Sequence, residues 1–234
     1  MKKIGILGGL GWYSTSIYYK KINNYINKIR NNQINPEIVL HSVDFEKILE
    51  ALEKEEWESI AELLTPKAVQ IEKAGADFLV VPSNTLHRII GEIDASINIP
   101  IINIVDVVGE KLNKSWCKRP GLLATKYTIE DGFYKNKLEN FYGQEIIIPD
   151  NREIDELTDI ITNELIGNDI NPGSRYYINN IIDNLMFKDV DSVILGCTEL
   201  SPLIDLIAAK DVRIIDSLEL HIREIVYHAI RKNL

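Results

Sequence analysis

The 234-residue sequence contains only two cysteines, Cys117 and Cys197, which are too few for a disulfide framework. No apolar run approaches the roughly 18 residues that a membrane span needs. The strand-like start, KIGILGG, has no signal-peptide pattern. No basic stripe offsets the net charge of -9, which argues against a nucleic-acid partner. These absences predict a cytoplasmic protein that binds neither a membrane nor nucleic acid.

Two further signatures are missing. No cluster of His, Cys, Asp and Glu has the spacing of metal ligands, so we expect no metal. The stretch GGLGW continues from Gly11 into Trp12, Tyr13 and Ser14, without the third glycine of a dinucleotide-binding fingerprint. The bulky Trp12 side chain would also obstruct a pyrophosphate, so the sequence argues against a dinucleotide cofactor.

Strand-like apolar runs alternate with helix-like periodic runs along almost the whole chain. The predicted strands are 3–7, 37–41, 77–81, 101–104, 121–124, 145–148, 191–195 and 212–215. The predicted helices are 14–30, 57–74, 85–93, 128–141, 153–165, 174–187 and 217–232. This alternation favours an α/β fold with mainly parallel sheets covered on both faces. In such folds ligands bind beyond the carboxyl ends of the strands, so the loops that follow strands are the candidate sites.

Four of these loops form two pairs of similar sequence. IGILGGLGWYST resembles PGLLATKYTIE, and AGADFLVVPSNTLHRI resembles DVDSVILGCTELSPLI. Aligning Leu7 with Leu123, and Ser83 with Cys197, gives nearly the same offset for both pairs. A shared offset favours a duplicated half-domain, although any α/β chain shows some such resemblance. Duplication would make Ser83 and Cys197 pseudo-symmetric groups that face one cleft.

Two polar triplets stand where a strand is predicted to turn into a helix: Ser83-Asn84-Thr85 and Cys197-Thr198-Glu199. Free backbone N–H groups and the helix dipole favour an anion there. The same field lowers the pKa of a cysteine thiol, and the thiolate is the reactive form. Asn84, Thr85 and Thr198 add neutral donors for a carboxylate. Simpler roles stay open, namely helix N-caps for Ser83 and Thr198 and a small buried apolar residue for Cys197.

Six stretches carry a resemblance that runs in order from end to end of the chain: GILGGLGWYSTSIYYKKIN, LHSVDFEKI, GADFLVVPSNTLH, GLLATKYTIEDGFYKNKL, VILGCTEL and IIDSLELHIREIV. Together they resemble the aspartate/glutamate racemase family. The resemblance implies two Rossmann-like α/β domains related by pseudo-two-fold symmetry, with the active site in the cleft between them. We expect residues 1–100 and 211–234 to form the first domain and residues 101–210 the second. Members of the family often form homodimers, on which the sequence itself carries no signal.

The resemblance also implies racemisation of an amino acid without a cofactor, pyridoxal phosphate included, by two groups on opposite faces of the α-carbon. Cys197 matches the second cysteine of the usual pair, whereas Ser83 holds the position of the first. A thiolate would remove the α-proton and the opposite group would deliver a proton to the other face. Some members carry a hydroxyl residue at the first position. A serine hydroxyl is nevertheless a far poorer base than a thiolate unless a neighbour activates it.

The expected substrate contacts are Leu10, Asn84, Thr85, Thr125, Thr198, Glu199, Leu52 and Glu156. Thr125 is among them because GLLATKYT repeats the first glycine loop. Acid-specific family members hold the distal carboxylate with basic or amide side chains, which align near Leu52 and Glu156 here. Leu52 cannot bind a carboxylate and Glu156 would repel one. The substrate is therefore aspartate or glutamate by resemblance, or alternatively a neutral or basic amino acid.

Two other functions stay open. One is a one-cysteine decarboxylase of disubstituted malonates from the same superfamily, in which a single thiol protonates an enediolate from one side. The other is a catalytically silent protein that binds an amino acid in the cleft. His87 and His221 fit either a role in closing the site or structural hydrogen bonding, and Asp44 fits a helix N-cap. Cys117 precedes a Pro-Gly turn and is expected to be inert.

Overall fold

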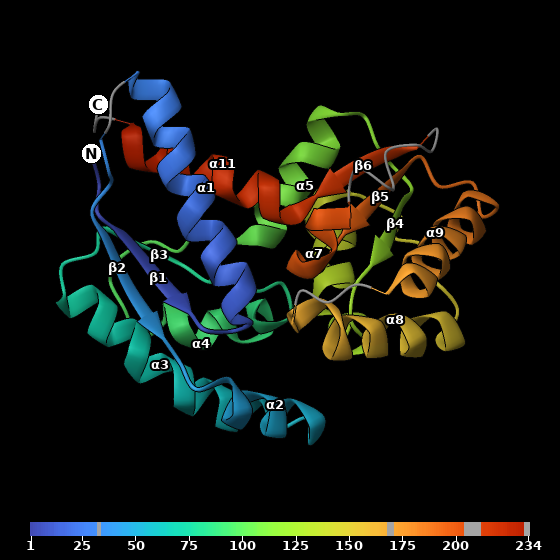
Figure 1. Cartoon of the computed structure of the whole chain (residues 1–234), viewed down its shortest axis with the longest axis horizontal. Coiled ribbons are helices and arrows are strands. Elements are labelled where there is room, and N and C mark those ends of the chain that lie inside the picture. The colour runs from blue at the N-terminus through green and yellow to red at the C-terminus, as the bar shows by residue number, and fades with distance from the viewer. Residues whose placement is uncertain (32–33, 168–170, 204–211, 232–234) are drawn as a thin grey trace. The chain divides into compact units, whose positions relative to one another are not determined.

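The computed structural model describes residues 1–31, 34–167, 171–203 and 212–231 (Figure 1). The chain forms two compact units, one of Met1–Asn103 with His221–Leu234 and one of Ile104–Leu220. Each unit contains a three-stranded sheet, and every strand pairing is parallel. The predicted α/β class with parallel sheets is confirmed. The domain boundary expected between 210 and 211 falls outside the described residues, and the part of the chain from 212 to 220 belongs to the second unit.

The first sheet has the strand order β2-β1-β3. Its strands are β1 (Ile4–Gly8), β2 (Ile38–Ser42) and β3 (Phe78–Val80). All residues of β1 and β3 are buried: β1 is the central strand, and β3, at one side of the sheet, also forms an isolated bridge between Leu79 and Ile101. Because the three strands run in one direction, the segments that follow them leave the sheet at the same edge.

Helices cover both faces of this sheet, and Figure 1 shows α1 and α3 on opposite sides of it. The helices of the first unit are α1 (Trp12–Arg30), α2 (Phe45–Glu53), α3 (Trp57–Lys73), the 3-10 helix η1 (Thr85–Ile89), α4 (Ile90–Asp94) and most of α11 (Ser217–Ile230). The buried face of α3 consists of Ile60, Leu64, Ala68 and Ile71, spaced three or four residues apart. This stripe packs with Leu7 and Leu79 of the sheet in the core.

The second sheet has the strand order β4-β5-β6, with β5 in the centre and fully buried. Its strands are β4 (Pro120–Leu123), β5 (Ser192–Leu195) and β6 (Arg213–Asp216). The other elements of this unit are α5 (Ile104–Lys114), α6 (Lys126–Glu130), α7 (Phe133–Tyr142), α8 (Asn151–Asn163), η2 (Leu165–Gly167), α9 (Pro172–Met186) and η3 (Thr198–Leu203).

Alternate residues of β5 belong to two separate apolar clusters. Ile194 packs in a cluster with Val108 of α5, whereas Val193 and Leu195 pack in a cluster with residues of α8 and α9 such as Ile178. Successive side chains of a strand point to opposite faces of the sheet. The two clusters therefore occupy the two faces of the second sheet, which explains why the three consecutive residues Val193, Ile194 and Leu195 are all apolar.

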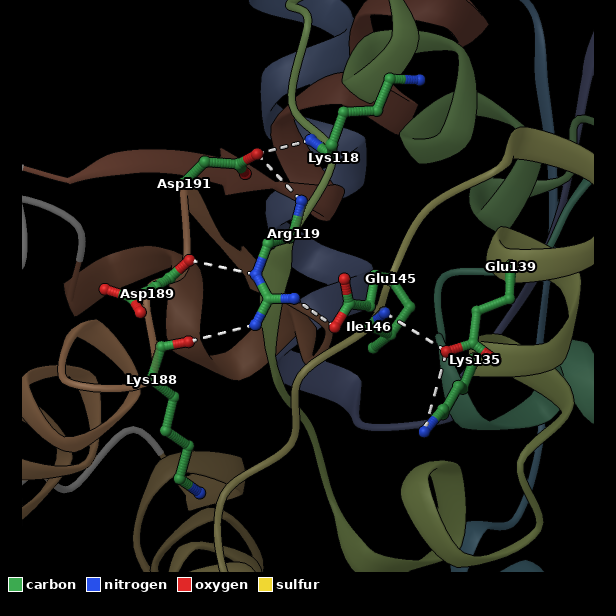
Figure 2. Close-up of polar contacts among 9 residues, drawn as sticks. All are labelled: Lys118, Arg119, Lys135, Glu139, Glu145, Ile146, Lys188, Asp189 and Asp191. Carbon is green, nitrogen blue, oxygen red and sulfur yellow. Dashed lines mark hydrogen bonds and ion pairs between the residues drawn. The ribbon is translucent and has the colours of Figure 1, made fainter.

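Polar contacts fasten the amino-terminal end of the second sheet (Figure 2). Asp191 precedes β5, and its carboxylate accepts hydrogen bonds from the backbone N–H groups of Lys118 at 2.5 Å and Arg119 at 2.9 Å, just before β4. Burial raises the pKa of Asp191, but these hydrogen bonds outweigh burial and the net shift is downward. Arg119 also forms an ion pair with Glu145. This cluster lies at the edge opposite to the loops that follow the strands.

Two predicted strands are wrong. The segment 101–104 contributes one isolated bridge, between Ile101 and Leu79, before α5 begins at Ile104. The segment 145–148 likewise contributes one bridge, between Ile147 and Gly121. Both segments are β-branched apolar runs, and such runs predict a strand whether or not a neighbour supplies a full ladder.

The prediction omitted two α-helices and merged two pairs of helices, η1 with α4 and α6 with α7. Neither α2 nor α5 was expected, although α2 begins after Asp44, whose carboxylate accepts a hydrogen bond from the Glu46 N–H at 3.2 Å. The N-cap role of Asp44 is therefore confirmed. The helix predicted at 128–141 is divided at Gly132, whose φ of 77° is left-handed. Lys232, at the predicted end of the last helix, lies outside the described residues.

No helix in the part of the chain that the structure describes is long and apolar enough to cross a membrane.

The contact between α3 and β1 should make Gly5 intolerant of substitution. A Cβ atom at Gly5 would lie 2.4 Å from Ile71 Cγ2 and 2.9 Å from Ala76 Cβ. We expect Gly5→Ala to destabilise the protein by about 1–3 kcal/mol because the helix must shift. Gly91→Ala is the matched control, since a Cβ there meets nothing within 4 Å. The midpoint of urea unfolding measures both, and a wild-type midpoint for Gly5→Ala would contradict this packing argument.

Candidate functional site

The loop after β1 has a backbone conformation that requires glycine. Gly9 has a φ of 82°, and a Cβ atom there would lie 2.5 Å from the backbone nitrogen of Val43. The Gly9 N–H donates to Thr15 Oγ1 at 2.9 Å, which ties the loop to the start of α1. Leu10 is buried in the core of the first unit. Any contact of Leu10 with a substrate would therefore be made by its backbone.

The loop after β3 carries the first polar triplet. Ser83 is half-buried, and its Oγ accepts a long hydrogen bond of 3.4 Å from the Leu86 N–H. Asn84 is buried and Thr85 is half-buried at the start of η1. His87 Nδ1 lies 2.7 Å from the Ser83 carbonyl oxygen. A carbonyl only accepts, so His87 donates from Nδ1 and holds the backbone at Ser83.

Both triplets lead into 3-10 helices, η1 and η3, and not directly into the α-helices that we expected. These helices contain five and six residues. Few peptide dipoles are aligned in such short elements, so the dipole contributes less there than at the start of a long α-helix.

A buried hydrogen-bonded chain lies behind the first triplet. His221 is fully buried, and its Nε2 lies 2.8 Å from the Ile102 carbonyl oxygen, to which it must donate. Its Nδ1 then accepts from the Tyr18 hydroxyl at 2.9 Å. Burial and the nearby ring of His87 lower the pKa of His221 to about 3. His221 is therefore neutral at pH 7, and structural hydrogen bonding is its observed role.

The loop after β5 carries the second triplet. Cys197 is half-buried, and its Sγ lies 3.0 Å from Oε2 of Glu199. The same oxygen accepts a hydrogen bond from Thr198 Oγ1 at 2.8 Å. Thr198 and Glu199 are both buried. A carboxylate oxygen only accepts, so the thiol of Cys197 is the donor in this contact.

This contact overturns the expectation of a lowered thiol pKa. Burial raises the pKa of Cys197 well above its ordinary value, and the charge of Glu199 and the hydrogen bond to it add to the rise. Hydrogen bonds from the backbone N–H groups of Thr198 and Glu199 act in the opposite direction but do not outweigh these effects. Cys197 is therefore a thiol, and not a thiolate, in this structure.

Two more polar residues follow the neighbouring strands of the second sheet. Thr125, buried after β4, has its Oγ1 3.4 Å from Oγ1 of Thr128. Asp216 ends β6, and its carboxylate accepts hydrogen bonds from the Ser201 hydroxyl at 2.5 Å and the Glu219 N–H at 3.2 Å. Asp216 was not among the site residues expected from the sequence. The signal was a carboxylate at the carboxyl end of a predicted strand.

The two residues expected to meet the substrate side chain have different surroundings. Leu52 is 5% exposed and belongs to the core of the first unit. Glu156 is exposed on α8. The pKa of Tyr177 is raised first by burial and then by the charge of Glu156. Neither position presents a basic group.

Each unit gathers its own share of the predicted site at the carboxyl edge of its sheet. The first unit holds Leu10, Ser83, Asn84 and Thr85, and the second holds Thr125, Cys197, Thr198 and Glu199. That the two sets face one cleft stays a prediction. No group of three or more His, Cys, Asp or Glu side chains that could hold a metal occurs among the described residues.

The fold and these loops define an α/β protein of two parallel-sheet units, with a thiol–carboxylate contact at the end of one central strand. Residues 7–225 match the family model described as Asp/Glu/Hydantoin racemase. The chain belongs to this family, which confirms the resemblance seen in its sequence.

Individual relatives agree with this assignment. The chain is 28% identical over 220 residues to the broad specificity amino-acid racemase RacX of Bacillus subtilis (strain 168), covering 92% of each protein. It superposes on an aspartate racemase homologue from Pyrococcus horikoshii OT3 with a TM-score of 0.82 at 32% identity, covering 99% of this chain and 100% of the other. It superposes on the Picrophilus torridus aspartate racemase with a TM-score of 0.78 at 25% identity, covering 100% and 96%.

The neutral, buried His221 predicts a loss of stability in acid. Its pKa is about 3 in the folded protein against an ordinary 6.5, so the unfolded chain binds more protons as the pH falls below 6.5. The free energy of unfolding should therefore decrease by up to about 1.4 kcal/mol per pH unit between pH 6 and 4. Urea unfolding midpoints at pH 7, 5.5 and 4.5 measure this loss.

The comparison of two variants isolates the contribution of His221. His221→Gln should reduce the slope of stability against pH, whatever its effect at pH 7. His41→Gln, at a half-buried position on β2, serves as the control for the substitution of a histidine by glutamine. Equal slopes in the wild type and His221→Gln would show that His221 does not carry this acid sensitivity.

Proposed function

We propose that this protein is an amino-acid racemase that works without a cofactor, with Cys197 and Ser83 as the acid/base groups on opposite faces of the substrate α-carbon. The supporting observation is the placement of Cys197, half-buried at the carboxyl end of the central strand β5 with its thiol hydrogen-bonded to Glu199. Ligands in open α/β sheets bind at this edge. Membership of the racemase family and the names of the relatives point to the same chemistry.

In the proposed reaction, Cys197 loses its thiol proton and the thiolate takes the α-proton of one enantiomer. The carbanion then takes a proton from the Ser83 hydroxyl on the other face. Ser83 then regains a proton from water, which balances the proton that Cys197 gave to water at the start, and Cys197 ends the cycle as the thiol. The hydrogen bond from the Leu86 N–H stabilises the Ser83 oxygen when it becomes negative, although at 3.4 Å it contributes little. Backbone N–H groups at the starts of η1 and η3 would bind the substrate carboxylate.

For the substrate we propose a neutral or basic amino acid. Position 52 offers an apolar side chain in the core, and position 156 offers an exposed carboxylate. Neither can bind the distal carboxylate of aspartate or glutamate. The relative from Bacillus subtilis is named a broad specificity racemase, which agrees with a side-chain pocket that does not demand an acidic group.

Exchange of the α-proton in deuterium oxide tests the proposed reaction. We expect the wild type to incorporate deuterium into both enantiomers of its substrate, and Cys197→Ser to lower the rate by about 100-fold or more because its acid/base group is lost. Ser83→Cys should retain or increase the rate. Cys117→Ser, at the buried second cysteine, is the matched control and should stay active.

The same measurement separates the alternatives. Full activity of Cys197→Ser would refute the assignment of the catalytic thiol. A decarboxylase would place deuterium only in the product of a disubstituted malonate, and a binding protein would exchange nothing. Because free enantiomers have equal energies, kcat/KM must be equal in both directions, so a slow Ser83 would reduce both directions alike.

A panel of the standard L-amino acids tests the proposed substrate class. We expect kcat/KM to be higher for neutral or basic amino acids than for aspartate and glutamate, because no basic group lies at position 52 or 156. Chiral chromatography of the products measures both enantiomers. A strong preference for aspartate or glutamate would remove this part of the proposal and leave the racemase assignment intact.

A further inference from the structure

The contact between Cys197 and Glu199 places a negative charge next to the thiol that the proposed reaction must ionise. Sγ of Cys197 and Oε2 of Glu199 are 3.0 Å apart, and Glu199 is only 7% exposed. Two anions at this distance in a buried place would repel strongly. The contact is stable only while one proton remains between the two atoms.

Thr198 fixes the direction of the carboxylate. Its hydroxyl donates to the same Oε2 at 2.8 Å, so one oxygen of Glu199 receives both hydrogen bonds. The second carboxylate at this edge, Asp216, is engaged by the Ser201 hydroxyl and the Glu219 N–H. Glu199 is the charged group that raises the pKa of the Cys197 thiol.

We propose that Glu199 is a charge gate for Cys197: its carboxylate keeps the sulfur protonated in the empty protein, and the α-ammonium group of a bound amino acid cancels that charge and releases the proton to water. The inference rests on the proposed function, to which it adds a role for Glu199 and a requirement for a cationic amine in the ligand. Without the ligand, burial and the Glu199 charge both hold the pKa of Cys197 high.

The geometry of an amino acid brings its ammonium group to this place. A thiolate that takes an α-proton must approach the α-carbon to within about 3–3.5 Å. The ammonium nitrogen is bonded directly to that carbon. Since Oε2 of Glu199 lies 3.0 Å from Sγ, the groups bonded to an α-carbon that contacts Sγ come near Glu199, whose charge attracts the ammonium group and repels the carboxylate. The charge that activates the thiol therefore arrives with the substrate.

A gate of this kind predicts how ligand-free Cys197 reacts with iodoacetamide, which alkylates only the thiolate. Glu199→Gln removes the charge and keeps the shape. We expect Cys197 of this variant to be alkylated at least about tenfold faster than in the wild type at pH 7, the equivalent of one pKa unit. Mass spectrometry of peptides reports Cys197 separately from Cys117. Glu130→Gln, which neutralises an exposed carboxylate on α6, should leave the rate unchanged.

A second variant moves the rate in the other direction. Thr198→Val removes one of the two hydrogen bonds to Oε2 and keeps the charge of Glu199. The carboxylate then accepts more strongly from the thiol, so Cys197 should be alkylated about two- to fivefold more slowly than in the wild type. A change that merely loosened the loop would speed alkylation in both variants. Circular dichroism confirms that each variant is folded.

The outcomes are distinct. Faster alkylation in Glu199→Gln together with slower alkylation in Thr198→Val supports the gate. An unchanged or slower rate in Glu199→Gln overturns it, and so does acceleration in both variants. If Glu199→Gln does not fold, the direction of the Thr198→Val effect decides alone. Alkylation is measured without substrate, so its result stands apart from the deuterium exchange that tests the proposed racemase.

The gate also predicts a difference in turnover. With the amino acid that the panel identifies, Glu199→Gln should lose discrimination against the N-acetylated form of that amino acid, which has no ammonium charge. Wild-type protein should exchange the α-proton of the free amino acid at least about 100-fold faster than that of the N-acetyl form. An equal ratio of the two rates in wild type and Glu199→Gln would contradict the requirement for a cationic amine.

Discussion

Parallel pairing around one buried central strand is the constraint on which each unit depends. β1 and β5 are buried along their whole length, so their backbone polar groups must be satisfied by neighbouring strands. Because those neighbours are parallel, every following loop leaves at one edge. Ser83 and Cys197 lie at such edges because they follow β3 and β5. Chemistry can therefore change at these positions, as serine for cysteine, without any change in the sheet.

The sequence predicts the fold well wherever burial alone decides the structure. The six strands of the two sheets coincide with predicted apolar runs, and the two central strands, β1 and β5, are buried along their whole length. The segments 101–104 and 145–148 have the same composition but make one bridge each. Their apolar side chains are buried or half-buried, whereas the number of ladder hydrogen bonds depends on the neighbouring backbone. A local pattern contains no information about that neighbour.

The sequence likewise predicts one part of the candidate site and not another. The loops that carry the site can be located from the sequence, because polar residues that follow parallel strands lie at one edge of the sheet. The protonation state of Cys197 cannot be predicted in this way, since it depends first on the burial of the sulfur and then on the Glu199 side chain, which η3 places at hydrogen-bond distance from it. From the sequence, Glu199 is expected to contact the substrate, and the helix dipole is expected to lower the pKa of the Cys197 thiol. Burial of the sulfur and a carboxylate at hydrogen-bond distance together outweigh the backbone N–H groups at the start of η3, which lower the thiol pKa.

The two triplets occupy matching places in the two halves of the chain. They differ in charge, and the difference suits the thiol and the hydroxyl that they carry as acid/base groups. The position that corresponds to Glu199 is held by Thr85, which is neutral. A thiol ionises close enough to neutral pH for a neighbouring charge to decide whether it is a thiolate, so a carboxylate beside Cys197 controls its reactivity. A serine hydroxyl stays protonated at neutral pH without such help. A carboxylate at position 85 would only oppose the negative charge that Ser83 acquires when it gives up its proton, whereas the backbone N–H of Leu86 stabilises that charge.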